Sequence, residues 1–461
     1  MRLILVGMIA VTLTACDLKS VLSGDVSVVA RAGELELSSD TLAAMIAEGK
    51  WPVRRDIAEQ MAYRWVEFAL LGQRLAQGDS LLDSATVFHA SWPDANQWLV
   101  DDYRDSLVAQ RVTVDSAVVD SAYQAGDHRM ISHILIRTRP DMSPPELQDA
   151  RVRAGRILAR LTATGNWPLA NELNEDPVAK REGGSLGLIT RGQMVPQFEE
   201  VAFSLAPGEL SGIVETPYGF HIIWRPKLAE VWDAYEEAIR EVLTQRMEDA
   251  FLVELIQRWD VRVRSNAPAA VREAVAAPLQ TFKSSVTIGT YRDGKFTTAD
   301  FVRWLQVLDR PVLQGLSTAS DEQIVELVRT LMRNEVLVRE ARESGVTYMP
   351  EDFTWLQGEL RKEIKKVTDR LALDSALAGA TTPDERLRAV EGSIRRYSHD
   401  LMRNAGTTVV VPAFLAERLR QEMPWSVSSA AVDQVVERAQ VLKAEQIEPP
   451  LDSASAAAPT R

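Results

Sequence analysis

The feature that most constrains the fold is a stretch of roughly a hundred residues whose pattern differs from the rest of the chain. Residues 128–228 contain short apolar runs typical of β-strands, at 130–136 and 222–224, which bracket one helix and a glycine-rich middle. On both sides, apolar residues instead recur every three or four positions, which indicates amphipathic helices. The sequence therefore predicts an α+β fold in which a small sheet domain lies between mainly helical segments.

The composition excludes several classes of protein. The 461 residues include 52 Lys or Arg against 65 Asp or Glu, and the formal net charge of −13 argues against a nucleic-acid partner, since no net positive field attracts phosphates. With one cysteine and five histidines, the chain cannot be a cysteine-rich zinc module, an iron–sulfur protein or a disulfide scaffold. A hydrophobic content of 46% is enough to bury cores without disulfides.

Residues 1–16 have the pattern of an export signal. Arg2 is followed by an apolar run over residues 3–15, which is too short to span a bilayer as a helix. The run ends in the letters LTAC, which resemble the bacterial lipobox, in which the cysteine is acylated and becomes the new N-terminus. The sequence thus predicts lipidation of Cys16 and a lipid-anchored membrane protein of the cell envelope that faces the periplasm. A plain signal peptide with a coincidental cysteine is the alternative.

The remaining chain is predicted to form the following segments around the sheet domain. Residues 17–127 form an N-terminal helical segment with a strand-turn-strand near its start, and 229–265 form a helix that packs back on it. The Ala/Pro-rich stretch 266–283 is predicted to be a linker. Residues 284–445 form a second helical segment, and 446–461 form a disordered tail.

The second helical segment looks like a repeat of residues 26–127. Residues 37–42 (LSSDTL) are similar to residues 296–301 (FTTADF), and each run follows a strand and a turn and opens a helix with a Ser or Thr cap. Each is followed by a long helix that ends in glycine, at Gly78 and Gly345. The spacing between matched residues changes along the chain, so the repeat requires at least one insertion or deletion.

A series of motifs follows in order within residues 128–228. They read ISHILI, then NEDP with GGSLG, then RGQMVPQFE, then AFSLAPGELS, and finally TPYGFHII. In this order they resemble the parvulin family of peptidyl-prolyl isomerases from end to end. The resemblance implies a four-stranded antiparallel sheet wrapped by helices, and isomerase activity on X–Pro bonds that requires no metal and no organic cofactor.

The resemblance also implies roles for particular residues. The first and last strands would carry His133 and His221, with Thr216 in their hydrogen-bond network, and Asp176 would lie beside the substrate carbonyl. Three apolar residues would line the pocket for the proline ring: Leu186, Met194 and Phe198. This set suits the reaction, because rotation about an X–Pro bond breaks no covalent bond and needs only an apolar clamp and a polar group beside the carbonyl.

Each assignment has an alternative that the residues leave open. On apolar strands, the two histidines fit a structural network as well as direct chemistry. Met194 and Phe198 have the spacing of an ordinary helix-to-core pair, and Asp176 before Pro177 could be a turn residue, which would leave a catalytically weak domain. Tyr218 stands where some relatives have serine, so its part in the network is open.

Helical segments around one parvulin domain, behind an export signal, resemble the periplasmic chaperone-isomerases of the SurA, PpiD and PrsA types. The resemblance implies unfolded or extended proline-containing polypeptides as clients, and the second helical segment could double the client cradle or form a homodimer surface. A catalytically inactive parvulin-fold chaperone for outer-membrane or secreted clients is the alternative, and a purely structural envelope lipoprotein is a third. Most of four tryptophans are expected in the core: Trp65, Trp232, Trp304 and Trp355.

Overall fold

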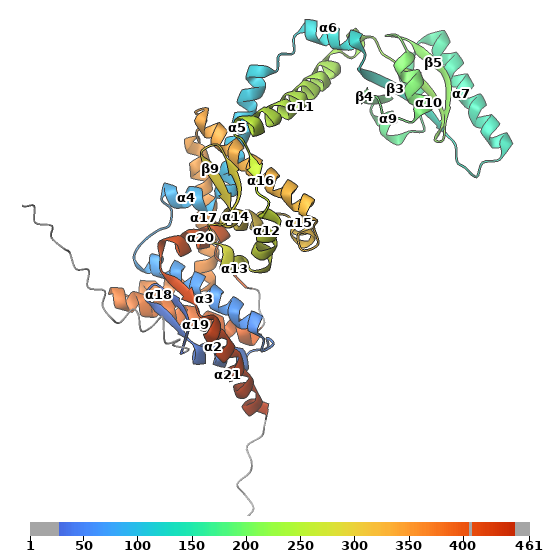
Figure 1. Cartoon of the computed structure of the whole chain (residues 1–461). Helices are drawn as coiled ribbons and strands as arrows, with labels where there is room; N and C mark the ends of the chain where they lie inside the picture. Colours follow the sequence, from blue (N-terminus) through green and yellow to red (C-terminus); the bar gives the residue numbers. More distant parts are fainter. Residues whose placement is uncertain (1–26, 405–407, 448–461) are drawn as a thin grey trace, which may run out of the picture. The chain divides into compact units, whose positions relative to one another are not determined.

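The structure is a computed structural model that describes residues 27–404 and 408–447, so the predicted lipidation site at Cys16 lies outside the described residues. The chain divides into two compact units, each of which is described by itself (Figure 1). Unit 1 comprises the described residues up to Leu99, residues 305–309 and the described residues from Gly345 onward, and unit 2 comprises the remaining described residues. No helix in the described part of the chain is long and apolar enough to cross a membrane.

Unit 1 combines the N-terminal strands with helices from both ends of the chain. Its sheet has the order β10-β1-β2, made of β1 (Val28–Ala32), β2 (Leu35–Ser38) and β10 (Trp425–Val427). Its helices are α2 (Ser39–Glu48), α3 (Arg55–Ala76), α4 (Ser84–Ala90), α17 (Pro350–Arg370), α18 (Leu373–Ala378), α19 (Pro383–Asn404), α20 (Ala413–Glu422) and α21 (Ser429–Ile447). Helix α5 (Trp92–Arg111) begins in unit 1 and ends in unit 2.

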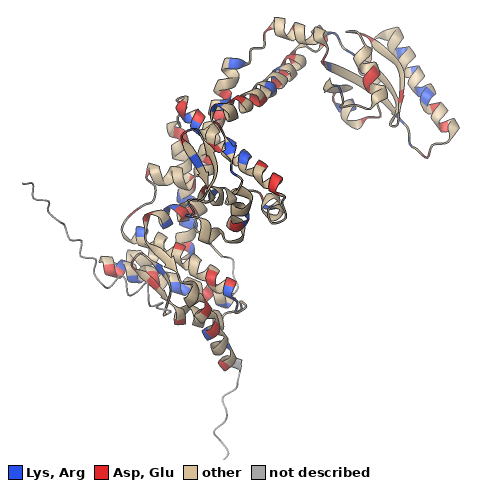
Figure 2. Cartoon of the chain, viewed as in Figure 1, with Lys and Arg blue, Asp and Glu red and all other residues tan. Residues whose placement is uncertain are grey.

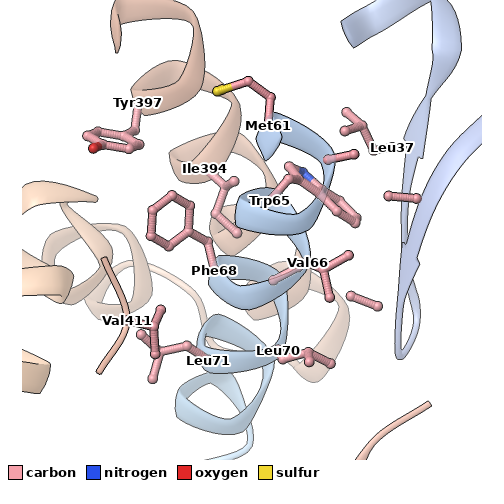
Figure 3. Close-up of a cluster of buried hydrophobic side chains, with 14 of the residues drawn as sticks. Leu37, Met61, Trp65, Val66, Phe68, Leu70, Leu71, Ile394, Tyr397 and Val411 are labelled. Atoms are coloured by element: carbon pink, nitrogen blue, oxygen red, sulfur yellow. The ribbon is translucent and has the colours of Figure 1, made fainter. Parts of the chain in front are cut away.

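Helix α3 is the centre of the core of unit 1, as its apolar spacing predicts. Its buried side chains include Trp65 and Phe68, and Figure 3 shows them between the strands and α19. Phe68 meets Tyr397 of α19 edge to face at 5.5 Å between ring centroids. A Cβ at Gly72 would lie 2.4 Å from Val390, so glycine is needed where these two helices approach.

The C-terminal helices therefore complete the core of the N-terminal strands. Strand β10 pairs antiparallel with β1, with Ala30 opposite Val427. The stretch 284–445, expected to form one segment, is divided between the two units, because its last part supplies a strand and helices that the short hairpin β1–β2 cannot replace. Of the predicted tail 446–461, residues 446 and 447 belong to α21 and the rest lies outside the described residues.

Unit 2 contains two sheets and the helices around them. Its strands are β3 (His128–Arg137), β4 (Ser185–Thr190), β5 (Leu210–Thr216), β6 (Gly219–Trp224), β7 (Arg262–Val263), β8 (Thr287–Tyr291) and β9 (Gly294–Thr297). Its helices are α6 (Ser116–Ala125), α7 (Pro144–Thr164), α8 (Trp167–Asn171), α9 (Pro177–Arg181), α10 (Pro196–Ser204), the 3-10 helix η1 (Leu228–Glu230), α11 (Trp232–Arg258), α12 (Ala267–Ala276), α13 (Pro278–Thr281), α14 (Thr298–Leu305), α15 (Arg310–Gly315) and α16 (Asp321–Glu343).

The predicted α+β fold class, with a four-stranded antiparallel sheet between helical segments, is confirmed. The four strands have the order β4-β3-β6-β5, and every neighbouring pair is antiparallel. Because side chains alternate between faces, Ile134 and Ile222 pack toward α7, whereas Ile131 and Ile223 pack toward α10. Both faces are covered, which explains why the two central strands, β3 and β6, are buried along almost their whole length.

Helix α11 packs against helices that precede the four-stranded sheet. Tyr235 meets Tyr123 of α6 edge to face at 4.9 Å, and Phe251 meets Tyr103 of α5 at 5.9 Å. Arg104 of α5 also forms an ion pair with Glu248 of α11. Figure 2 shows Lys and Arg interspersed with Asp and Glu along this helix, as on an exposed helix stabilised by charges of both signs.

The two regions compared as repeats both form a hairpin followed by a helix. Strands β1 and β2 lead into α2, and strands β8 and β9 lead into α14. Each hairpin receives a third strand from elsewhere in the chain, β10 in unit 1 and β7 in unit 2. The turns differ in one respect: Gly33 has φ +54° in the first, whereas Asp293, and not Gly294, has the positive φ in the second.

The prediction of a linker at residues 266–283 is wrong. These residues form α12 and α13, and α12 packs against β8 and α16. Ala267, Val271 and Ala274 are fully buried, with the spacing of one helix face. The alanine and proline content was taken for a link, but Pro268 lies in the first turn of α12, where its missing N–H costs nothing.

The tryptophans fall into two groups. Trp65 is a core residue, exposed to 5%, and Trp232 and Trp304 are partly buried. Trp355 of α17 is instead 51% exposed and is the exception among these four residues.

Candidate active site

The two histidines lie on one face of the four-stranded sheet. In the pairing of β3 with β6, His133 is opposite Ile223 and Leu135 is opposite His221. Since residues two apart on a strand share a face, the two imidazoles are diagonal neighbours on the face that α10 covers. Their Nδ1 atoms are 3.2 Å apart and their rings lie 28° from parallel. Both side chains are buried, exposed to 4% and 5%.

Asp176 reaches this pair from the start of helix α9. As the N-cap residue, it accepts hydrogen bonds at Oδ1 from the backbone N–H of Val178 and Ala179, at 3.0 and 3.2 Å. Its other oxygen, Oδ2, lies 3.1 Å from Nε2 of His133. The carboxylate therefore faces the paired imidazoles, and the turn role considered for Asp176 and the contact with His133 exist together.

Thr216 holds the second histidine from the other side. Its Oγ1 lies 2.8 Å from Nε2 of His221 and accepts a hydrogen bond from the backbone N–H of Tyr218 at 3.1 Å. The tight turn between β5 and β6 allows this contact. Gly219 has φ +137° there, and a Cβ would lie 2.2 Å from the carbonyl oxygen of Ile136, so no other residue fits without a backbone shift.

The four side chains form one continuous hydrogen-bonded chain with a fixed direction. An ionised Asp176 only accepts, so His133 donates from Nε2 and offers a lone pair at Nδ1. His221 must then donate from Nδ1, which leaves its Nε2 to accept from the hydroxyl of Thr216. All ring nitrogens of both histidines are used, and one carboxylate sets both tautomers.

The direction of the pKa shifts agrees with this charge pattern. Burial lowers the pKa of His133, opposed in part by Asp176, and burial together with the neighbouring His133 lowers the pKa of His221 to about 4. Burial also acts to raise the pKa of Asp176, but the N–H groups of Ala179 and Val178 and the contact with His133 outweigh it and lower that pKa. At neutral pH the site holds two neutral imidazoles and one carboxylate.

The three predicted pocket residues lie in one groove, next to the hydrogen-bonded side chains of Asp176, His133, His221 and Thr216. Phe198 of α10 is 2% exposed, and its ring meets both imidazoles edge to face, at 5.8 Å from His133 and 5.2 Å from His221. Leu186 of β4 and Met194, just before α10, pack against the same apolar cluster and remain partly accessible. The groove has a volume of about 1020 Å³, and the apolar trio, Asp176 and both histidines line it.

The residues that form this groove match a known protein family. Residues 133–226 match the family model described as Rotamase, PPIC-type PPIASE domain. The residues matched include all seven predicted site residues. Residues 133–226 are a PPIC-type PPIase domain.

The relatives of the PPIase domain carry chaperone or foldase names. Chaperone SurA of Alkalilimnicola ehrlichii is 35% identical over 30% of this chain and 32% of that protein. Foldase protein PrsA of Halalkalibacterium halodurans is 36% identical over 24% of this chain and 34% of that protein. The chain thus spans about a third of the length of these curated relatives. Among solved structures, PrsA from Bacillus subtilis is 24% identical over 32% of this chain and 54% of that chain, with a TM-score of 0.21.

The PPIase domain also uses residues that the sequence alone did not single out. Asn174 is 3% exposed and ties the loop before Asp176 to β3: it accepts from the N–H of Leu135 at 2.9 Å and donates to the carbonyl of His133 at 2.8 Å. Its Oδ1 also accepts from the N–H of Asp176 at 3.0 Å. Its place two residues before Asp176 in the NEDP motif is the only sequence signal for this positioning role.

The rim of the groove contains a second group that was not predicted. Gln193, Tyr218 and Arg137 line it, together with Pro217 and Met142. The side chain of Tyr218 is 62% exposed, so this residue contributes to the network through its backbone N–H while its ring borders the groove. Among the described residues, no cluster of three or more His, Cys, Asp or Glu side chains could hold a metal ion.

Proposed function

We propose that this chain is a peptidyl-prolyl cis–trans isomerase of the cell envelope that acts on X–Pro bonds of unfolded exported proteins and also holds these clients. The observation that carries the proposal is the juxtaposition in one groove of an apolar pocket and the Asp176–His133–His221–Thr216 chain. The match of residues 133–226 to the PPIC-type domain supports it.

The apolar trio would act on the amide itself. Rotation about an X–Pro bond must cross about 18–20 kcal/mol, because resonance gives the C–N bond partial double-bond character. A planar amide has more separated charge than a twisted one, so an apolar pocket that excludes water from it favours the twisted form. Leu186, Met194 and Phe198 would bind the proline ring and supply this environment. No proton needs to move and no bond needs to break.

The carboxylate would act on the carbonyl, and the histidines would position it. A negative charge near the carbonyl oxygen destabilises the planar amide, in which that oxygen is most negative, more than the twisted amide. Asp176 is ionised and borders the groove. Both ring nitrogens of His133 and of His221 already form hydrogen bonds to the neighbouring side chains of the network. This favours a positioning role for the histidines over direct proton transfer.

The location and the partners are further parts of the proposal. The LTAC motif supports acylation of Cys16 and attachment to a membrane on the periplasmic side, and replacement of Cys16 by Ser should then release the protein from the membrane fraction. The names of the relatives, Chaperone SurA and Foldase protein PrsA, support unfolded polypeptides as clients. A homodimer also stays a prediction, which sedimentation velocity tests.

The alternative, a catalytically inactive chaperone with a parvulin fold, differs in one measurable respect. The full chain should accelerate cis–trans exchange of a proline tetrapeptide above the uncatalysed rate and should speed the refolding of a denatured protein whose folding is limited by proline isomerisation. Suppression of client aggregation with no acceleration in either assay would leave only the alternative. No acceleration and no suppression would contradict both functions.

A further inference from the structure

Unit 1, which does not include the PPIase domain, has an aromatic patch. The patch, defined by Phe88, Trp98, Tyr348, Phe353 and Trp355, combines residues of α4 and α5 with residues in and just before α17. Phe88 stacks on Tyr348 at 4.5 Å and contacts Phe353 at 5.6 Å, and Trp98 meets Trp355 at 5.0 Å. Four of these side chains pack on the core of unit 1, but Trp355 is 51% exposed.

The exposed indole of Trp355 has a packed ring as its neighbour. Its neighbour Trp98 packs on the core of unit 1 and so supports the indole of Trp355 on one side. On the same face of α17, one turn further on, Gly358 leaves open space: a Cβ there would have no neighbour within 4 Å. A half-exposed tryptophan supported by a packed ring and next to an unfilled surface suits a binding site, because aromatic side chains of this kind contribute most to binding when a partner covers them.

The charges next to the exposed pair are negative. Asp94 lies one turn before Trp98 on α5, and Glu351 lies one turn before Trp355 on α17, which places each carboxylate beside its tryptophan. Among the described residues, neither Asp94 nor Glu351 has a cationic side chain within ion-pair distance. The patch therefore offers an aromatic surface with two carboxylates that a cationic partner could pair with, and Lys or Arg can also stack on an indole face.

We propose that the aromatic patch binds unfolded client segments in which aromatic or aliphatic residues alternate with Lys or Arg. This inference rests on the proposed client-holding function and adds to it a site and a client chemistry. The patch shares no residue with the PPIase groove, so a client could be held at the patch by a segment that contains no proline.

The test uses the full chain and a labelled peptide without proline, so that binding of a proline ring in the PPIase groove does not contribute. In the first peptide, the Lys peptide, Phe or Leu alternates with Lys or Ser. In the second peptide, the Glu peptide, Glu replaces every Lys. In the third peptide, Ser replaces every Phe and Leu. Fluorescence anisotropy should show that Trp355→Ser weakens binding of the Lys peptide about tenfold, and that Glu351→Lys weakens it by several-fold. Both positions are exposed, and an unchanged thermal midpoint checks folding. Val441→Ser and Glu437→Lys, exposed on α21, are the matched controls and should bind like the wild type.

The outcomes separate this inference from the proposed function. Equal binding by Trp355→Ser and the wild type, or equal binding of the Glu and Lys peptides, would overturn the inference while leaving client-holding intact if aggregation is still suppressed. A wild-type dimer that Trp355→Ser converts into a monomer would also overturn it, because the patch would then bind a second copy. Failure of the wild type both to bind the peptide and to suppress aggregation would contradict the chaperone function itself.

Discussion

Replacement of Asp176 by Asn should reverse the hydrogen-bonded chain in the groove rather than break it. The side chain must keep an oxygen toward the backbone N–H groups of Val178 and Ala179, since both of these groups donate to Oδ1. The new amide NH₂ then faces Nε2 of His133 and donates to it. His133 must move its proton to Nδ1, and His221 in turn must carry its proton on Nε2.

The energetic cost of this change should be small, because every partner stays bonded. The hydroxyl of Thr216 would accept from His221 and turn its own proton toward the carbonyl of Gly219, which lies 3.5 Å away. A charge-assisted hydrogen bond is replaced by a neutral one, a loss of roughly 1 kcal/mol in the free energy of unfolding. The removed charge should have a larger effect on catalysis, and we expect kcat/KM to fall about tenfold, which corresponds to about 1.4 kcal/mol.

The assay is long-range nitrogen–proton NMR of the imidazoles, which distinguishes the protonated ring nitrogen from the unprotonated one. The wild type should show His133 protonated at Nε2 and His221 at Nδ1, and Asp176→Asn should show both exchanged. Asp141→Asn, at an exposed carboxylate that pairs with Arg139 in the same domain, should leave the pattern unchanged. Identical tautomers in the wild type and in Asp176→Asn would show that the carboxylate does not determine the tautomers of His133 and His221.

Three further predictions concern stability. Because the pKa of His221 is lowered to about 4, the unfolded state binds more protons than the folded state between pH 6.5 and about 4. The free energy of unfolding should therefore fall by ~3 kcal/mol from this group as the pH is lowered through that range. Urea titrations of the wild type and of His221→Asn should differ in this pH dependence. Phe198→Ala should lower the free energy of unfolding by about 3–5 kcal/mol, because the ring is fully packed; a loss under about 1 kcal/mol would mean that the groove is not packed as described. Gly219→Ala should lower the free energy of unfolding by at least about 2 kcal/mol. Gly212→Ala in strand β5, where a Cβ would have no neighbour within 4 Å, should leave it nearly unchanged. Equal thermal midpoints for the two variants would contradict the turn geometry.

Local patterns predicted the parts of the fold that local physics decides. The spacing of apolar residues predicted helices on both sides of the sheet domain, and the resemblance to parvulins implied the four-stranded sheet and the groove around Asp176. Pairing over long distances could not be predicted in this way: β10 is too short to be recognised, and its partner β1 lies almost at the other end of the chain. The error at residues 266–283 arose because alanine-rich composition outweighed the spacing of Ala267, Val271 and Ala274.

Within the site, residue types were predictable but their connections were not. The resemblance to parvulins implied roles for His133, His221, Thr216 and Asp176. No sequence pattern shows that every ring nitrogen of the two histidines is hydrogen-bonded, with all donors oriented toward Asp176. Asn174 was overlooked because its role is to hold the backbone of two segments together, which leaves no mark besides its position.

The central claim is that the apolar pocket beside the carboxylate accelerates rotation about X–Pro bonds, and one comparison tests it most directly. The catalysed exchange rate of a proline tetrapeptide should be measured for the full-length wild type, for Met194→Ala, and for Leu147→Ala on helix α7, an exposed apolar residue that does not line the groove. We expect Met194→Ala to lose at least about tenfold in kcat/KM and Leu147→Ala to match the wild type. Equal rates for all three proteins would contradict the account.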